Sequence, residues 1–283
     1  MLRRVSLIIV LTLLAAAVVA AVAPSLGTQG ARAPGLDLYD AYGELLTRFV
    51  RDGRVDYRAL VTDRPLLDRV VDQVAHVLPS QEQRWTREER LAFWINAYNV
   101  ITLRSIVDHY PIRGSLFTLY PRNSIRQIDG VWTTQKWLAA GRMVTLDAIE
   151  HDILRPTFKD PRVHFAVNCA SRSCPPLRST PYIGREIDGQ LDDSTRRFLA
   201  SEQGVRVSNG HLLVSSIFKW YGEDFAAATA DGRAAPAGDT EPAIRAFIER
   251  YGSPAAVATA KAGLPVRFLA YDWSLNDIDR PHQ

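Results

Sequence analysis

Two thiols and an imidazole lie within eleven residues of one another, in the stretch RVHFAVNCASRSCPPL that spans residues 162–177. His164 is followed by Cys169 and Cys174, the two cysteines of the chain. A cysteine assisted by a histidine can act as a nucleophile, two cysteines can form a disulfide or exchange with another dithiol, and thiols with imidazole can bind a metal. Each arrangement predicts a different function.

In the catalytic hypothesis, one cysteine attacks a carbonyl carbon as a thiolate while an imidazole takes up the proton. His164 is the natural base because it lies on the segment that leads into the cysteine loop. Cys174 is favoured over Cys169 as the nucleophile, since the loop places it nearer solvent. Three residues could orient the imidazole: Glu150, Asp272 and Asn276. The protein would then be a cysteine-dependent acyl transferase or amide hydrolase.

The main alternative is a disulfide between Cys169 and Cys174, in a non-catalytic binding or scaffold module. Such a bridge would close a short loop and contribute about 2 kcal/mol. A thiol redox protein is a further alternative, although redox motifs usually have two residues between the thiols and this chain has four. The known zinc spacings are not reproduced, so we expect neither a metal nor a cofactor.

Other polar residues fall where they could line a substrate pocket. Asn96 and Asn99 lie three residues apart, on one face of a strongly apolar helix, and Asn168 directly precedes the cysteine loop. Their simpler interpretation is that they satisfy buried backbone groups. The tryptophans and tyrosines are expected in the core, while an exposed subset could form a peptide- or carbohydrate-binding wall.

The elements that must position these residues are mostly helical. Thr86 and Glu89 form a capping box for a buried helix that runs to about His109, before Pro111. Thr145 can cap a helix that carries Glu150 and ends at Pro156. Further amphipathic helices are expected over residues 38–49, 187–199 and 242–251, after Pro65, and as a short aromatic helix capped by Ser216.

Strand signals are short and scattered. Residues 162–168 alternate apolar side chains with His164 and Asn168, which predicts a strand. Hairpins are predicted at Asp129–Gly130 and at Asn209–Gly210, and PVRFLAYDW is a last strand. The fold class is therefore α+β, a helix-rich single domain with a small mixed or antiparallel sheet. By analogy of catalytic parts, a papain-like or transglutaminase-like architecture is one form of it.

Composition and the N-terminus predict the setting. The 283 residues are 47% hydrophobic with a formal charge of +3, and no basic stripe points to nucleic acid. Residues 1–23 join Arg3 and Arg4 to a long apolar run, which predicts a signal peptide or an uncleaved membrane anchor. Residues 24–35 are a flexible leader and residues 36–278 the domain. We expect an extracytoplasmic protein, periplasmic or secreted, acting on an envelope peptide, glycan or protein, with membrane contact only through its N-terminal segment.

Five stretches, taken in order, carry a family resemblance. They are AFWINAYNV, TLDAIEHDILR, RVHFAVNCASRSCPPL, SSIFKWYGEDF and YDWSLN. Together they resemble the domain of unknown function 547 family over roughly residues 36–277. The family carries no settled activity, so the resemblance implies no catalytic residue, and the chemistry rests on the residues themselves.

Overall fold

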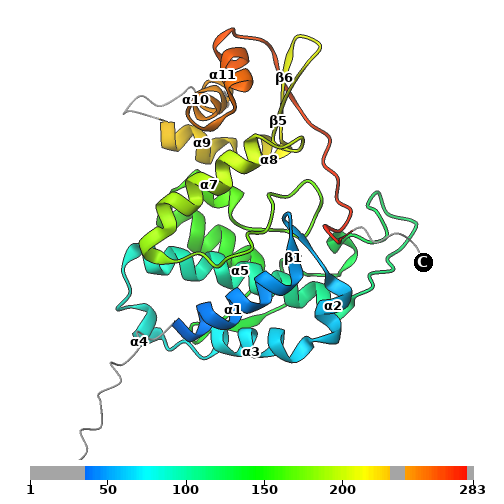
Figure 1. The fold of residues 1–283 in the computed structure, drawn as a ribbon, viewed down its shortest axis with the longest axis vertical. Coiled ribbons are helices and arrows are strands. Elements are labelled where there is room, and N and C mark those ends of the chain that lie inside the picture. Colours follow the sequence, from blue (N-terminus) through cyan, green and yellow to red (C-terminus); the bar gives the residue numbers. More distant parts are fainter. Residues whose placement is uncertain (1–35, 230–239, 279–283) are drawn as a thin grey trace, which may run out of the picture. The chain divides into compact units, whose positions relative to one another are not determined.

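The structure, a computed structural model, describes residues 36–229 and 240–278 (Figure 1). The predicted N-terminal segment, residues 1–23, and the leader, residues 24–35, lie outside the described residues. None of the described helices is both long and apolar enough to cross a membrane. The described residues form a helix-rich α+β domain with small sheets, as the sequence predicted.

Helix α5 (Arg87–His109) is the centre of the larger core. The Thr86 hydroxyl accepts a hydrogen bond from the Glu89 amide, and the Glu89 carboxylate accepts one from the Thr86 amide, so the predicted capping box is confirmed. Most of the helix is buried from Leu91 to Val107. A helix buried on nearly all sides can only be covered by several other elements.

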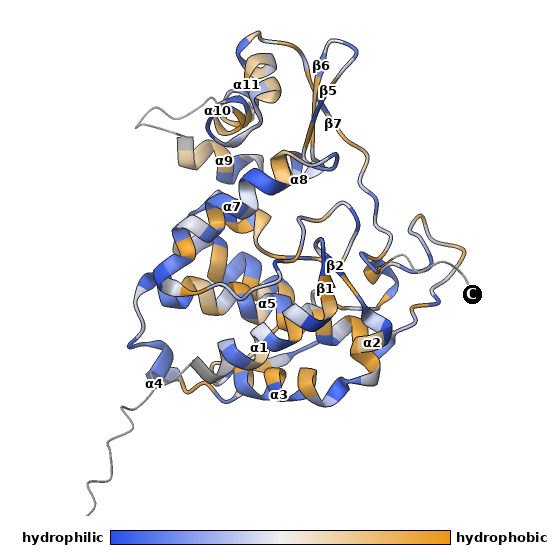
Figure 2. Cartoon of the chain, in the orientation of Figure 1, coloured by the Kyte–Doolittle hydropathy of each residue, from blue (hydrophilic) through white to orange (hydrophobic). Residues whose placement is uncertain are grey.

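Those elements are helices before and after α5 in the chain. The other helices are α1 (Leu36–Phe49), α2 (Tyr57–Thr62), α3 (Arg64–Ala75), α4 (Pro79–Glu82), α6 (Arg155–Phe158), α7 (Ile187–Leu199), α8 (Ser216–Trp220), α9 (Gly222–Thr229), α10 (Glu241–Tyr251) and α11 (Pro254–Lys261). In Figure 2, α3 and α7 alternate hydrophilic and hydrophobic residues, as expected of helices with one buried face. The predicted helices over 187–199 and 242–251 are therefore confirmed to within a residue.

The strands form three small sheets. Two are antiparallel pairs, β1 (Val50–Arg51) with β2 (Arg54–Val55) and β3 (Trp137–Ala139) with β4 (Arg142–Val144). The third is mixed: β6 (His211–Val214) pairs antiparallel with β5 (Val205–Ser208) and parallel with β7 (Val266–Phe268).

One of the two predicted hairpins is correct. Ser208 pairs with His211 across Asn209 and Gly210, both of which have positive φ, as a two-residue hairpin turn requires. The hairpin predicted at Asp129–Gly130 is wrong. The chain turns there without strand pairing, and the β3–β4 turn falls instead at Ala140–Gly141.

The buried side chains divide into two clusters. The larger one surrounds α5 and includes α1 and α3. The smaller one is aromatic and joins the end of α7 to β5, β6 and the helices α8–α11. Phe165 belongs to the smaller cluster, whereas its neighbour Val163 belongs to the larger one. The segment that carries His164 therefore joins the two clusters.

That segment is a 3-10 helix, η3 (Pro161–Phe165), and the strand predicted over 162–168 is wrong. The Asp160 carboxylate accepts a hydrogen bond from the Arg162 amide, and Pro161 occupies the first turn, both of which favour a helical start. Alternation of apolar residues misled the prediction because Val163, His164 and Phe165 are all buried, on different sides of the turn.

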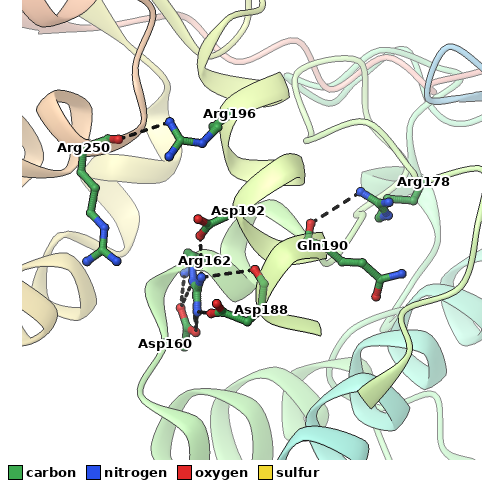
Figure 3. A network of polar contacts seen from close by, with 8 residues as sticks. All are labelled: Asp160, Arg162, Arg178, Asp188, Gln190, Asp192, Arg196 and Arg250. Carbon is green, nitrogen blue, oxygen red and sulfur yellow. Dashed lines mark hydrogen bonds and ion pairs between the residues drawn. The ribbon is translucent and has the colours of Figure 1, made fainter. Parts of the chain in front are cut away.

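An ionic network fixes η3 against α7 (Figure 3). The Arg162 guanidinium forms ion pairs with Asp160 at 2.7 Å, Asp188 at 2.8 Å and Asp192 at 2.5 Å, the last two on α7. Arg162 lies two residues before His164, so the network also limits where that imidazole can lie.

Candidate active site

A cavity of about 540 Å³ opens among the residues that the sequence singled out. Its lining includes both cysteines and His164, together with Glu150. Several aromatic residues complete its walls: Tyr98, Tyr120, Trp132, Trp220, Tyr221, Tyr271 and Trp273. Polar groups that converge in an aromatic cavity are typical of a binding or catalytic site.

The cysteine loop is held by the C-terminal segment of the domain. Ser171 pairs with Leu275 in an antiparallel bridge, and the Arg172 amide donates to the Ser274 carbonyl at 2.8 Å. Ala170 has a positive φ of 57°, which turns the chain sharply after Cys169. The loop shape therefore depends on residues about one hundred positions further along the chain.

Cys169 lies among hydrogen-bond donors, and we call Cys169, Cys174, Ser171 and Tyr271 the thiol cluster. The Cys169 sulfur is 3.3 Å from both the Ser171 and the Tyr271 hydroxyl oxygen. A hydrogen bond from the Cys174 thiol, aided by those from the two hydroxyls, outweighs the effect of burial and lowers the pKa of Cys169 to about 7. A substantial part of Cys169 is therefore thiolate at neutral pH.

The preference for Cys174 as the nucleophile is not supported by its position. Its side chain is buried, and its sulfur accepts a hydrogen bond from the Cys169 amide at 2.8 Å. Burial, together with the hydrogen bond to Cys169, raises the pKa of Cys174 well above its usual value. Both cysteines are free and their sulfurs are not at disulfide distance, so the Cys169–Cys174 bridge is not found.

The imidazole belongs to a second group, the imidazole cluster of His164, Asp224, Arg155, Glu150 and Tyr221. The His164 ring is buried and stacks on Tyr221, with 3.8 Å between ring centroids. Its Nε2 lies 2.7 Å from the Asp224 carboxylate, to which Arg155 also donates two hydrogen bonds. Burial would raise the pKa of Asp224, but the hydrogen bonds from His164 and Arg155 hold it well below its usual range.

The other ring nitrogen, Nδ1, is buried without a hydrogen-bond partner. It faces Glu150 at 3.8 Å, beyond hydrogen-bond distance. Because Nε2 carries the proton donated to the ionised Asp224, Nδ1 presents its lone pair toward Glu150. Neither nitrogen bonds to a sulfur among the described residues, so donors in the thiol cluster, not the imidazole, stabilise the thiolate.

Glu150 is positioned by an unusual helix. Residues Ala148–Leu154 form a π-helix, η2, in which the Arg155 amide donates to the Glu150 carbonyl five residues earlier. The predicted Thr145 cap is present, since its hydroxyl accepts a hydrogen bond from the Ala148 amide. Burial, followed by the charge and hydrogen bond of Glu150, raises the pKa of the Tyr221 hydroxyl, which therefore remains a proton donor to Glu150. π-helices often occur at functional sites, where the wider turn redirects a side chain.

Besides the two clusters, the cavity has an aromatic wall that includes one arginine. Trp220 stacks on Trp273, with 5.8 Å between centroids, and Trp132 meets Trp273 edge to face. The Arg126 guanidinium lies 5.1 Å from the Trp273 ring centroid and 5.4 Å from that of Trp132. We call these four residues the aromatic wall. A cation among aromatic faces suits an anionic ligand that also has a flat or apolar part.

Comparison with known proteins identifies part of the chain. Residues 82–199 match the family described as "Protein of unknown function, DUF547". This segment is similar to that family. No curated protein and no solved structure matches the chain. The papain-like or transglutaminase-like form of the fold therefore remains a prediction.

The matched segment, residues 82–199, contains only part of the candidate site. It includes the cysteines, His164 and Glu150, whereas Asp224 and Tyr271 come from later in the chain. The sequence did not identify Asp224, Tyr221, Ser171 or Tyr271 as site residues. The available signals were three stretches that resemble the family: SSIFKWYGEDF contains Tyr221 and Asp224, YDWSLN contains Tyr271, and RVHFAVNCASRSCPPL contains Ser171.

Asn96 and Asn99 do not line the cavity. The Asn96 side-chain nitrogen donates to the Tyr182 carbonyl at 2.8 Å, and the Asn96 side-chain oxygen accepts a hydrogen bond from the Tyr182 amide at 3.0 Å. Asn99 bonds the Ala166 carbonyl and the Asn168 amide. These contacts match the simpler interpretation, in which the two residues satisfy buried backbone groups.

Three other predicted residues also lie away from the cavity lining. Asn168 bonds the Pro175 carbonyl and the Ala170 amide, and so shapes the cysteine loop. Asn276 bonds Asn168 and Tyr57. Asp272 is exposed and caps the Ser274 amide, so Asp224, and not Asp272 or Asn276, orients His164. In the described part of the chain, no three His, Cys, Asp or Glu side chains are grouped to hold a metal ion.

Proposed function

We propose that this protein catalyses cysteine-dependent acyl transfer or amide hydrolysis, with Cys169 as the nucleophile. The observation that carries the proposal is the thiol cluster: a thiol and two hydroxyls surround a sulfur that lines a cavity, and their hydrogen bonds lower the pKa of Cys169 to about 7. A structural cysteine needs no such arrangement, and burial alone would raise its pKa.

The imidazole cluster supports the same chemistry from another part of the cavity. His164 Nδ1 has no hydrogen-bond partner and lies 3.8 Å from the Glu150 carboxylate, so the two groups are close enough to pass a proton between them. We assign this His164–Glu150 pair as the general acid and base. Asp224 keeps the ring in one tautomer, as the third residue of a catalytic triad does.

The proposed reaction has two steps, acylation of Cys169 and deacylation. The Cys169 thiolate attacks the carbonyl carbon, a carbon–sulfur bond forms, and the carbon–nitrogen bond of the amide breaks as the amine leaves with the proton of the His164–Glu150 pair. Water, or another nucleophile in acyl transfer, then attacks the thioester. Its proton returns to the pair and the thiolate is released.

The test is a comparison of the two cysteines. With p-nitrophenyl acetate, the wild-type protein should release a burst of nitrophenol and carry an acetyl group at Cys169, detected by mass spectrometry of its peptides. C169A should show neither. C174A, the comparison variant, should keep the burst at a reduced rate, because the hydrogen bond from Cys174 to the thiolate is lost. Acetylation of neither cysteine in the folded, reduced protein would refute the proposal.

The aromatic wall favours a second candidate function, the binding of a peptide or glycan without catalysis. Trp220 is 46% exposed and stacks on Trp273, so the wall presents an aromatic surface that a ligand can cover. In that case, envelope peptides or glycan fragments should quench tryptophan fluorescence equally in wild-type and C169A protein, and no acyl-enzyme should form.

A further inference from the structure

A loop beside the cavity, residues 114–120, presents three large apolar side chains to solvent, and its last residue, Tyr120, lines the cavity. Leu116 is 73% exposed, Phe117 99% and Leu119 101%. No other group of large hydrophobic residues in the described ranges, 36–229 and 240–278, is exposed to this degree. Contiguous apolar groups at the tip of a loop indicate a surface that another phase or molecule covers.

The loop has a defined shape. The Gln127 side chain spans it, donating to the Thr118 hydroxyl at 2.7 Å and to the Ser115 carbonyl at 3.1 Å, and accepting from the Ser115 amide. At the base, the Gly114 amide donates to the Arg122 carbonyl, and the Arg122 guanidinium donates back to the Gly114 carbonyl. The apolar side chains are thus held outward by hydrogen bonds within the loop.

Gly114 is required by this arrangement. A Cβ at this position would lie 2.3 Å from side-chain carbons of Gln127, closer than non-bonded atoms can approach. A larger residue would therefore displace Gln127 and release the loop.

The charge around the loop is positive. From His109 to Ile128 the sequence has no Asp or Glu, while Arg113, Arg122 and Arg126 are all exposed. Arg113 and Arg122 line a surface hollow of about 440 Å³ at the base of the loop, together with Ile112 and Asn123. Two guanidinium groups in one hollow suit a phosphate group.

We propose that this loop inserts into the interface of a membrane that contains anionic phospholipid. Leu116, Phe117 and Leu119 would enter the acyl boundary, while Arg113 and Arg122 bind a lipid phosphate. An apolar tip above a cationic base matches the order of acyl chains and phosphates in a lipid monolayer. This contact is additional to the predicted N-terminal one and does not depend on the proposed catalysis.

The test uses the full chain, because residues 1–23 would hold every variant on the vesicles. The protein is reconstituted into vesicles of phosphatidylcholine alone, or of equal parts phosphatidylcholine and phosphatidylglycerol, with a trace of phospholipid bearing a photoreactive group on its acyl chain. The positions of cross-linking are mapped by mass spectrometry. We expect cross-links at residues 115–120 in the anionic vesicles.

Three variants make the result specific. F117S/L119S should lower the loop cross-links about ten-fold, and R113Q, which leaves the hydrogen bond from Arg122 to Gly114 in place, should lower them about five-fold in anionic vesicles only, since one arginine contributes modestly near a charged surface. L78S, which alters an exposed leucine elsewhere, should leave them unchanged. The proposal is overturned if wild-type protein cross-links only through residues 1–23. It is also overturned if F117S/L119S abolishes self-association in the absence of lipid, since the loop would then bind a second copy.

Discussion

At the thiol cluster, Cys169 is surrounded by neutral donors, two hydroxyls and a thiol, whose hydrogen bonds favour its negative charge. At the imidazole cluster, by contrast, His164 lies between two carboxylates and beside an arginine, with one nitrogen fixed and the other unpaired. In the proposed mechanism, the first arrangement prepares a nucleophile without a base, and the second holds a base without a nucleophile. We therefore expect that each function can be removed without the other.

The largest separation is expected from H164N. Turnover of an acyl substrate should fall about 10²–10⁴-fold because the general acid and base is lost. Alkylation of Cys169 by iodoacetamide should stay within about three-fold of wild type, since neutral donors stabilise the thiolate. H76N, a change at an exposed histidine that does not line the cavity, serves as the control. Equal loss of alkylation and turnover would contradict the separation.

D224N should act on the imidazole cluster alone, with a smaller effect. We expect turnover to fall about ten-fold and stability to fall by about 1–3 kcal/mol, because Asp224 accepts hydrogen bonds from Arg155 and His164. The depressed pKa of Asp224 contributes stability that is present above about pH 4, its unfolded value, and is lost as pH falls below it.

Chemical denaturation at several pH values checks the prediction for Asp224. The wild-type protein should lose its advantage over D224N progressively below about pH 4. A constant difference down to pH 2 would show that the carboxylate is not held by its partners.

Y271F should act on the thiol cluster alone. The loss of one donor to the thiolate should raise the pKa of Cys169 by about one unit from its value of about 7. Iodoacetamide alkylation, measured against pH, should then be several-fold slower at pH 7 and equal to wild type above about pH 9. Y251F, at a tyrosine of the smaller core cluster that does not line the cavity, should not move the profile.

R126Q should have the smallest effect, and should leave both clusters intact. Arg126 is a member of the aromatic wall, where its guanidinium contacts the Trp132 and Trp273 rings, and it belongs to neither cluster. For an acyl substrate with a carboxylate, KM should rise about ten-fold with little change in kcat, whereas an uncharged substrate should be unaffected. A fall in kcat for both substrates would place Arg126 nearer the reacting atoms.

The sequence predicted the elements whose signals are local. The Thr86–Glu89 box and the Asn209–Gly210 turn are each encoded within four residues, and both are present. The strand prediction for residues 162–168 was wrong because burial on several sides of a 3-10 turn produces the same short alternation of apolar residues as a strand.

The candidate site was predictable only where its residues are close in sequence. His164, Cys169 and Glu150 were identified from residue type and position. Asp224 and Tyr271 were not, because they reach the cavity from 60 and 102 residues beyond their partners, which no local pattern encodes. The choice between the two thiols was also unpredictable, since it depends on the backbone amide that bonds Cys174.

The pairing of the cysteine loop with the C-terminal segment has a consequence for biosynthesis. Ser171 pairs with Leu275, and Val55, near the other end of the domain, pairs with Asp277. Contacts between such distant positions form late, after most of the chain has emerged from the ribosome. A chain that ends before residue 271 cannot place Tyr271 beside Cys169, and we expect its thiol to be less reactive than that of the complete domain.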